Sequence, residues 1–274
     1  MTPGFVVIPG DKRPVTIEYA WIARERSTTP LLVFLHEGLG SLARWHGWPQ
    51  AACDAIGCRG LVFSREGYGR STPRPHDEAW TASYLHRQAL QALPQLFAAL
   101  EIDSTRNPVW LVGHSDGGSI ALIFAASFPA HTAGVIALAP HIMVEDASIA
   151  SIERARDAFR DTDLAVRLRK YHADPVSAFG GWCGVWLSPE FRRWSIEDML
   201  RGVRCPVLAV QGDCDEYGTL AQIDGLARRA PNVQKRVLAG HEHALPRDAP
   251  EVLTRLIGEF VAQHTPTQRG GESQ

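Results

Sequence analysis

The chain has 274 residues, of which 45% are hydrophobic, enough to bury the core of one large domain or of a domain with a cap. Its 28 Lys and Arg against 30 Asp and Glu give a formal net charge of −2. A balance so close to neutral predicts no basic surface for nucleic acid or for an anionic membrane.

Several absences bear on location and partners. No window of about eighteen uninterrupted apolar residues occurs, which argues against a membrane-spanning helix. Residues 1–14 lack the charged region and apolar stretch of a secretion signal. The five cysteines show no tight C-x-x-C spacing and are interpreted as reduced thiols. The sequence therefore predicts a cytoplasmic protein whose partner is a small-molecule substrate. It leaves the oligomeric state open, a homo-oligomer included.

Short apolar segments predict the strands of a sheet. In chain order they are FVVIP (5–9), VTIEYAWIA (15–23), LLVFLH (31–36), RGLVFS (59–64), PVWLVG (108–113), AGVIALA (133–139), PVLAVQ (206–211) and NVQKRVLAG (232–240). A Gly-Asp turn joins the first two. The next five are continuously apolar, which is typical of parallel strands buried on both faces. The last alternates more and fits a position near the sheet edge.

Between the strands the apolar residues recur at helical spacing. This period predicts helices over 85–100, 220–227 and 252–260. Strands that alternate with helices imply right-handed crossovers and an open α/β sheet.

Residues 141–203 interrupt this alternation, because their apolar residues are helix-spaced and no buried strand is evident. We expect a helical cap here, over a core made of residues 1–140 and 204–264. Residues 265–274 are polar and aperiodic, which predicts a disordered tail.

The segment GHSDGG (113–118) lies between a predicted strand and a predicted helix. It contains G-x-S-x-G in the context that this motif requires. A sharp turn from strand to helix strains the serine backbone and leaves room only for small neighbours. Ser115 is therefore the candidate nucleophile, raised beside the free N–H groups of a helix start.

A serine hydroxyl is a weak nucleophile, which needs a histidine to take its proton and an acid to orient that histidine. Candidate acids follow the strand 206–211, where open α/β sheets place their sites: Asp213, Asp215 and Glu216. Two histidines, His241 and His243, follow the last predicted strand.

Four landmarks make the chain resemble the α/β-hydrolase fold superfamily. They are LHEGLGS (35–41), SREGYGRS (64–71), GHSDGG (113–118), and QGDCDEYG (211–218) paired with GHEHALP (240–246). The resemblance extends over the sequence apart from the cap and tail. It implies a mostly parallel central sheet flanked by helices, with a helical cap insertion, and the chain order serine, acid, histidine.

The resemblance also implies roles for individual residues. The acid of the family lies three residues after the glycine that ends the strand, which is Asp215 here, with Glu145 or Asp146 as a second place for it. The spacing to the downstream R-D-x-P-E segment favours His243 as the base. The family's usual G-H pair favours His241, which stays an alternative.

An oxyanion hole is the other half of acyl-transfer chemistry, and by resemblance its donors are the backbone N–H groups of Asp116 and Gly38. The family reads H-G-x-x-G where this chain has Glu37 in place of the first glycine. Glu37 then shapes the loop; alternatively, its carboxylate contacts substrate or shifts the pKa of a nearby histidine. His36 is interpreted as a buried residue that braces this loop, and Arg70 as the member of a local ion pair.

The aromatic run FGGWCGVWLSPEFRRW (179–194) places Trp182 and Trp186 within the cap. These side chains are candidates for an apolar pocket over Ser115 that takes a modest-sized hydrophobic or aromatic group. No three ligands at a recognisable spacing predict a metal, and no nucleotide-binding motif occurs. We therefore expect no metal and no cofactor.

Taken together, these residues predict a serine hydrolase that cleaves a small carboxylic ester or a lactone through an acyl-enzyme. The main competing hypothesis is a carbon–carbon bond hydrolase acting on a diketone, which uses the same triad. A cofactor-free perhydrolase or oxygenase and a non-catalytic ligand receptor also use this fold, so both stay open as hypotheses.

Overall fold

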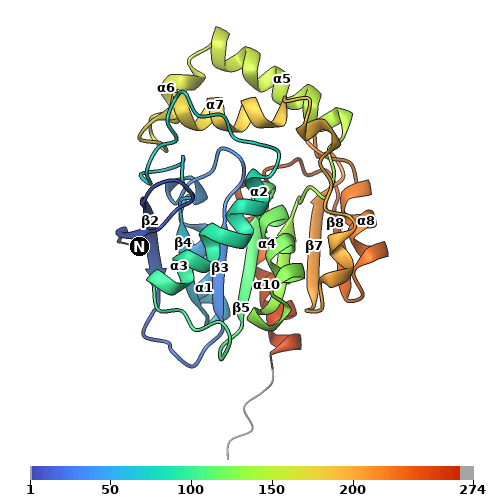
Figure 1. The fold of residues 1–274 in the computed structure, drawn as a ribbon. Coiled ribbons are helices and arrows are strands. Elements are labelled where there is room, and N and C mark those ends of the chain that lie inside the picture. Colours follow the sequence, from blue (N-terminus) through green and yellow to red (C-terminus); the bar gives the residue numbers. More distant parts are fainter. Residues whose placement is uncertain (1, 266–274) are drawn as a thin grey trace, which may run out of the picture.

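The computed structural model describes residues 2–265, in which eight strands form one sheet (Figure 1). The strands are β1 Gly4–Ile8, β2 Val15–Ile22, β3 Leu31–Leu35, β4 Arg59–Phe63, β5 Val109–His114, β6 Thr132–Leu138, β7 Val207–Gly212 and β8 Val233–Leu238. Their order is β1-β2-β4-β3-β5-β6-β7-β8. β2 pairs antiparallel with both of its neighbours, β1 and β4. All other neighbouring pairs of the sheet are parallel.

The mostly parallel sheet and its flanking helices confirm the fold class expected from the sequence. All residues of β3 and β5 are buried, as continuous apolar runs between two helical layers require. β8 lies at the sheet edge and is partly exposed, in keeping with its more polar sequence. The tail expected over 265–274 lies, except for Thr265, outside the described residues.

Helices cover both faces of the sheet. One face packs against α1 (Trp48–Ile56) and α10 (Pro250–His264). The other packs against α2 (Tyr84–Arg87), α3 (Leu93–Ala99), α4 (Asp116–Ser127) and α8 (Ala221–Arg229). The remaining short helices are α9 (Leu245–Asp248) and the 3₁₀ turns Ala43–Trp45, Pro129–His131, Phe191–Arg193 and Met199–Gly202.

The helix expected over 85–100 is not uniform, since a π-helical segment, Gln88–Ala92, separates α2 from α3. Pro94 is the second residue after this segment and cannot donate the backbone hydrogen bond of a regular α-helix. The hydrophobic period persists through this irregularity, so the buried face is the expected one.

Three helices within residues 141–203 lie over the sheet: α5 Asp146–Asp161, α6 Leu164–Leu168 and α7 Pro175–Trp186 (Figure 1). We call residues 141–203 the cap. α7 begins with Pro175 after Asp174, whose side chain accepts a hydrogen bond from Ser177 N–H at 2.8 Å, an arrangement that stabilises a helix start. The rings of Phe159 and Phe179 stack at 4.0 Å and join α5 to α7.

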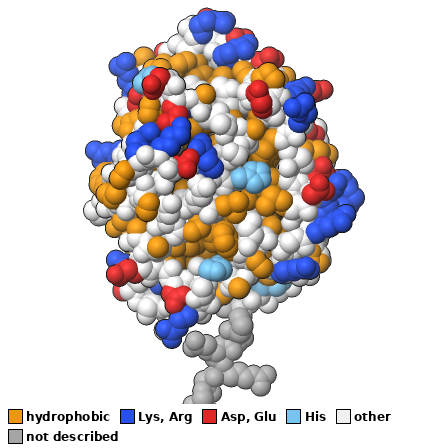
Figure 2. Space-filling view, in the orientation of Figure 1, with side chains coloured by type: hydrophobic (Ala, Val, Ile, Leu, Met, Phe, Trp, Pro, Cys, Tyr) orange, Lys and Arg blue, Asp and Glu red, His pale blue; other side chains and the backbone are white. Residues whose placement is uncertain are grey.

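Basic and acidic side chains are interspersed on the face shown in Figure 2. In the cap, for example, Arg160 pairs with Asp157 and Asp161, and Arg167 pairs with Asp163. None of the helices within residues 2–265 has the length and apolar character that crossing a membrane requires.

Candidate active site

Ser115 lies at the turn between β5 and α4 with φ 55° and ψ −119°. A positive φ is unfavourable for a residue with a Cβ and is retained where the surrounding structure imposes it. The backbone around Ser115 is so crowded that only glycine fits at two neighbouring positions. A Cβ on Gly113 would collide with the backbone of Gly117, and a Cβ on Gly117 would collide with the carbonyl of Leu35. Gly113 and Gly117 therefore allow the tight turn that places Ser115 at the end of β5, where it borders the cavity described below.

Asp215 follows β7, and His243 follows β8. His243 Nδ1 lies 2.8 Å from Asp215 Oδ1. The same carboxylate accepts hydrogen bonds from the backbone N–H groups of Tyr217 and Gly218 and from Gln211 Nε2. Burial raises the pKa of Asp215, but the hydrogen bond and charge of His243, the Tyr217 N–H and the nearby His141 together outweigh it, so the pKa lies below its usual value. Asp215 is thus a carboxylate that orients an imidazole through its Nδ1–H.

The other candidates for acid and base lie elsewhere. His241 is partly exposed, and its Nδ1 lies 3.0 Å from the carbonyl oxygen of Ala239. The Glu145 carboxylate binds the N–H and hydroxyl of Thr219, and Asp146 is an exposed partner of Arg192. Among the residues described, Asp215 is the carboxylate hydrogen-bonded to the His243 ring.

Ser115 and His243 border the same cavity, of about 270 Å³, together with Gly38, Asp116, Trp182 and Trp186. Residues 2–265 show no hydrogen bond between the Ser115 hydroxyl and His243. Hydrogen bonds of this kind often shorten only in the substrate complex. The cavity therefore unites the candidate nucleophile, base, oxyanion donors and pocket tryptophans that the sequence predicts.

The two candidate oxyanion donors differ in origin. The Asp116 N–H belongs to the first turn of α4, where N–H groups have no intrahelical partner. Gly38 lies in the loop after β3, and a Cβ there would collide with the indole of Trp182. Glycine at position 38 therefore lets the cap approach the loop closely.

The loop after β3 is braced by buried polar contacts. His36 Nε2 accepts a hydrogen bond from the Arg65 N–H at 3.0 Å, and Arg65 Nη2 donates to the Glu37 carbonyl at 2.8 Å. His36 is thus the bracing residue expected. The assignment of an ion pair to Arg70 is wrong, because Arg70 is exposed and contributes its backbone N–H to Glu18. The buried Arg65 of the same loop forms an ion pair instead, with Asp116 at 3.7 Å.

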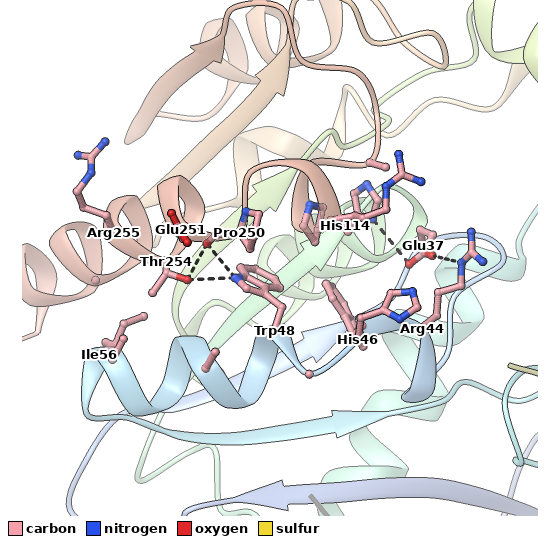
Figure 3. Close-up of a pocket in the computed structure, with 18 of the residues that line it drawn as sticks. Glu37, Arg44, His46, Trp48, Ile56, His114, Pro250, Glu251, Thr254 and Arg255 are labelled. Carbon is pink, nitrogen blue, oxygen red and sulfur yellow. Dashed lines mark hydrogen bonds and ion pairs between the residues drawn. The ribbon is translucent and has the colours of Figure 1, made fainter. Parts of the chain in front are cut away.

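Glu37 presents its carboxylate to two basic side chains. Arg44 Nε lies 3.3 Å from Oε1, and His114 Nδ1 lies 3.7 Å from Oε2 (Figure 3). Burial by itself raises the pKa of Glu37, whereas His114 and Arg44 lower it well below the usual range. The Nε2 of His114 in turn lies 2.9 Å from the His243 carbonyl oxygen. Glu37 is therefore an ionised residue linked through His114 to the backbone of the candidate base.

Comparison with known proteins agrees with this arrangement. The model of the alpha/beta hydrolase fold family matches residues 30–170, just over half of the chain. The chain is an α/β hydrolase. It is 27% identical to monoglyceride lipase of Homo sapiens, over 88% of this chain and 85% of that protein. It is 28% identical to serine hydrolase BPHL of Homo sapiens, over 73% of this chain and 66% of that protein.

Solved structures show the same fold. An esterase from Thermogutta terrifontis superposes with a TM-score of 0.73 at 19% identity, covering 97% of this hydrolase and 100% of the other chain. The meta-cleavage product hydrolase from Pseudomonas fluorescens superposes with a TM-score of 0.72 at 18% identity, covering 96% and 98%. At these identities the likeness concerns the fold alone.

Two buried side chains near the candidate site have contacts that the sequence did not predict. The Asp116 carboxylate, which follows Ser115, is buried and accepts hydrogen bonds from Tyr84 Oη at 2.5 Å and Trp186 Nε1 at 3.2 Å. Burial raises the pKa of Asp116, and Arg65 opposes that shift. An aspartate beside a buried nucleophile needs such partners, but the pattern of the sequence does not say which residues supply them.

His141, at the end of β6, is a second residue that was missed. It is buried, borders the cavity and lies with its ring centre 5.7 Å from that of His243. Burial is the main cause that lowers the pKa of His141 to about 3. The imidazole is therefore neutral near pH 7 and adds no positive charge beside His243.

We predict that Asp116→Ala lowers the free energy of unfolding by about 3–5 kcal/mol, since removing one partner leaves the Arg65 charge buried without its anion. The Arg65 atoms Nε and Nη1 already lack partners among the described residues, and Nη2 would keep only neutral carbonyl acceptors such as that of Glu37. Urea denaturation measures the loss. Asp116→Asn is the matched control, because it keeps an acceptor for Tyr84 and should lose less. A loss below about 1 kcal/mol for the alanine variant would contradict the role of this pair.

Proposed function

We propose that this hydrolase cleaves small carboxylic esters or lactones through an acyl-enzyme formed on Ser115. The observation that carries the proposal is the cavity in which strained Ser115 faces the same space as the hydrogen-bonded pair of His243 and Asp215. The names of the relatives, a monoglyceride lipase and a serine hydrolase, support ester cleavage.

The first half of the reaction forms the acyl-enzyme. Ser115 Oγ attacks the carbonyl carbon while His243 Nε2 takes the hydroxyl proton, and Asp215 stabilises the imidazolium that results. The N–H groups of Gly38 and Asp116 bind the oxyanion of the tetrahedral intermediate; one such donor contributes roughly 2.7–4 kcal/mol. His243 then gives its proton to the leaving oxygen as the carbon–oxygen bond breaks, so an alcohol departs.

The second half releases the acid. His243 takes a proton from water, whose oxygen attacks the acyl carbon, and the oxyanion again lies against Gly38 and Asp116. Collapse of the intermediate breaks the bond to Ser115 Oγ, to which His243 returns the proton. One ester and one water thus give one acid and one alcohol, and the free enzyme is restored.

The shape of the cavity bears on the acyl group. Its volume, about 270 Å³, is near the lower end for small-molecule pockets, which run from roughly 300 to 1,000 Å³. Trp182 and Trp186 border it from the cap, and Ile152 of α5 adds an apolar side chain. We therefore assign to it an acyl group of modest size and hydrophobic character.

Fluorophosphonate labelling tests the proposal without knowledge of the natural substrate. An activated serine attacks the phosphorus centre, so we expect a single adduct, mapped by mass spectrometry to the peptide that carries Ser115. Heat-denatured protein is the control and should not react. Absence of an adduct, or an adduct on another serine, would overturn the assignment. Absence of labelling together with tight binding of small ligands would instead favour a receptor.

A further inference from the structure

A groove much larger than the catalytic cavity lies beside it, between α1 and α10, with a volume of about 1320 Å³. In Figure 3 it extends from Ile56 and Arg255 at one end to Glu37 and His114 at the other. The catalytic cavity and the groove share the lining residues Glu37, Arg44, His114, Ala244 and Arg247. The two spaces therefore meet beside the candidate base. Nothing in the steps proposed above uses the groove.

Small apolar residues of two facing helices form part of the walls of the groove. Ala51 and Ala55 line it from α1, and Pro250 and Gly258 line it from α10. The indole N–H of Trp48 is already bound by the Pro250 carbonyl and the Thr254 hydroxyl, each at 3.1 Å. Trp48 thus contributes ring surface to the groove and no free donor.

The three arginines that line the groove already have partners. Arg44 pairs with Glu37 at 3.3 Å, Arg247 with Asp248 at 2.7 Å, and Arg255 with Glu259 at 3.2 Å. An anionic ligand would have to compete with these carboxylates for each guanidinium. The lining therefore suits an apolar chain better than a charged group.

The length of the groove favours an extended occupant. The wall formed by α1 runs from Trp48 to Ile56, which is about 12 Å at a rise of 1.5 Å per residue. A compact ring would fill only part of this distance. An unbranched chain could contact the small residues along the whole wall.

The position of the groove also says which part of an ester it faces. Ala244 and Arg247, which follow His243, line both the groove and the catalytic cavity, whereas Trp182 and Trp186 line the catalytic cavity alone. In the proposed mechanism His243 delivers a proton to the leaving oxygen, so the group on that oxygen must lie on the His243 side.

We propose that the groove binds the alcohol part of the substrate, and that this part is an extended, largely apolar chain. The inference rests on the proposed function and makes it more specific. The modest catalytic cavity holds the acyl group, and the groove holds the chain that departs. The favoured substrates are therefore esters of a short acid with a long-chain alcohol.

Chain-length preference in the wild-type protein tests this proposal first. With monomeric ester below its aggregation concentration, we expect kcat/KM for decyl acetate to exceed that for ethyl acetate by at least about tenfold, because added methylene groups gain apolar contact. We expect no such gain for ethyl decanoate, whose chain is on the acyl side. Equal values for decyl and ethyl acetate would overturn the proposal, and so would a preference for ethyl decanoate.

Ala55→Trp fills the groove far from Ser115. Ala55 is exposed on α1, so a larger side chain should occupy the groove without entering the core. We expect kcat/KM to fall by about tenfold or more for decyl acetate and to change by less than about twofold for ethyl acetate. Ala98→Trp is the matched control: Ala98 is an exposed alanine on α3 outside the groove, and both esters should keep their wild-type values.

The outcomes separate this inference from the proposed function. If the wild-type protein turns over ethyl acetate but Ala55→Trp spares decyl acetate, the groove assignment is wrong and the hydrolase assignment stands. An equal loss on both esters would also refute it, since blocking the groove should spare the short one. If no ester is hydrolysed at all and Ser115 is not labelled, the proposed function fails and the groove proposal falls with it.

Discussion

Replacing Ser115 by alanine should lower kcat/KM for short p-nitrophenyl esters by at least about 10⁴-fold, because the acyl-enzyme can no longer form. The oxyanion donors and the binding cavity remain, so a small residual rate above the uncatalysed reaction is expected. Initial rates followed by release of p-nitrophenol measure the effect. An unchanged rate would defeat the assignment of the nucleophile.

The fold of Ser115→Ala should remain intact. Alanine keeps the Cβ that Ser115 already carries at φ 55°, so the substitution adds no backbone strain. Circular dichroism and thermal unfolding check this point. Ser148→Ala is the matched control, since Ser148 borders the same cavity but donates its hydroxyl to the Tyr217 carbonyl. It should retain activity within about fivefold, as expected for a serine that takes no part in acyl transfer.

Local patterns were sufficient to predict the sheet and the turn at Ser115. A buried parallel strand is continuously apolar because both of its faces are covered, and the segments before Ser115 and Asp215 have this pattern. The glycines around Ser115 also allowed a prediction from the sequence, since only glycine fits beside the strained turn. These properties depend on near neighbours in the chain, so the sequence displays them directly.

Contacts between distant segments were not predictable in the same way. Asp116, Tyr84 and Trp186 come from three separate helices, and one hydrogen-bonded cluster joins them. Their positions in the sequence carry no periodic relationship. The buried Arg65 was likewise missed in favour of Arg70, because both lie in one glycine-rich loop and only the fold shows which of them turns inward. A polar network of this kind is specified by packing.

The groove illustrates a third limit. Helix α1 was not expected from the sequence. The sequence therefore did not indicate that its small residues Ala51 and Ala55 line one wall of a groove. α10 was expected, yet its Gly258 shows no function until α1 is placed opposite it. A groove between two helices forms where the side chains that face it are small. A hydrophobic pattern indicates mainly which side chains are buried, so it does not predict such a groove.

His243→Ala should lower kcat for the same esters by at least about 10⁴-fold, whereas His241→Ala should change it by less than about threefold. The two histidines are two positions apart, which makes His241 a close matched control. The structure distinguishes the two histidines by the direction in which each ring points and by its partner. The ring of His243 is held by Asp215 at 2.8 Å and borders the cavity of Ser115, while the His241 ring does not line that cavity and contacts the carbonyl of Ala239.

The variant with the larger loss of kcat identifies the general base. The chemistry of proton transfer explains why the two losses should differ widely. Without an imidazole at position 243, Ser115 loses the base that Asp215 orients to take its proton and to return a proton to the leaving oxygen. His141 borders the cavity as well, but burial lowers its pKa to about 3, so it is a weak acceptor of protons. A larger loss for His241→Ala than for His243→Ala would transfer the role to His241 and require the loop after β8 to rearrange.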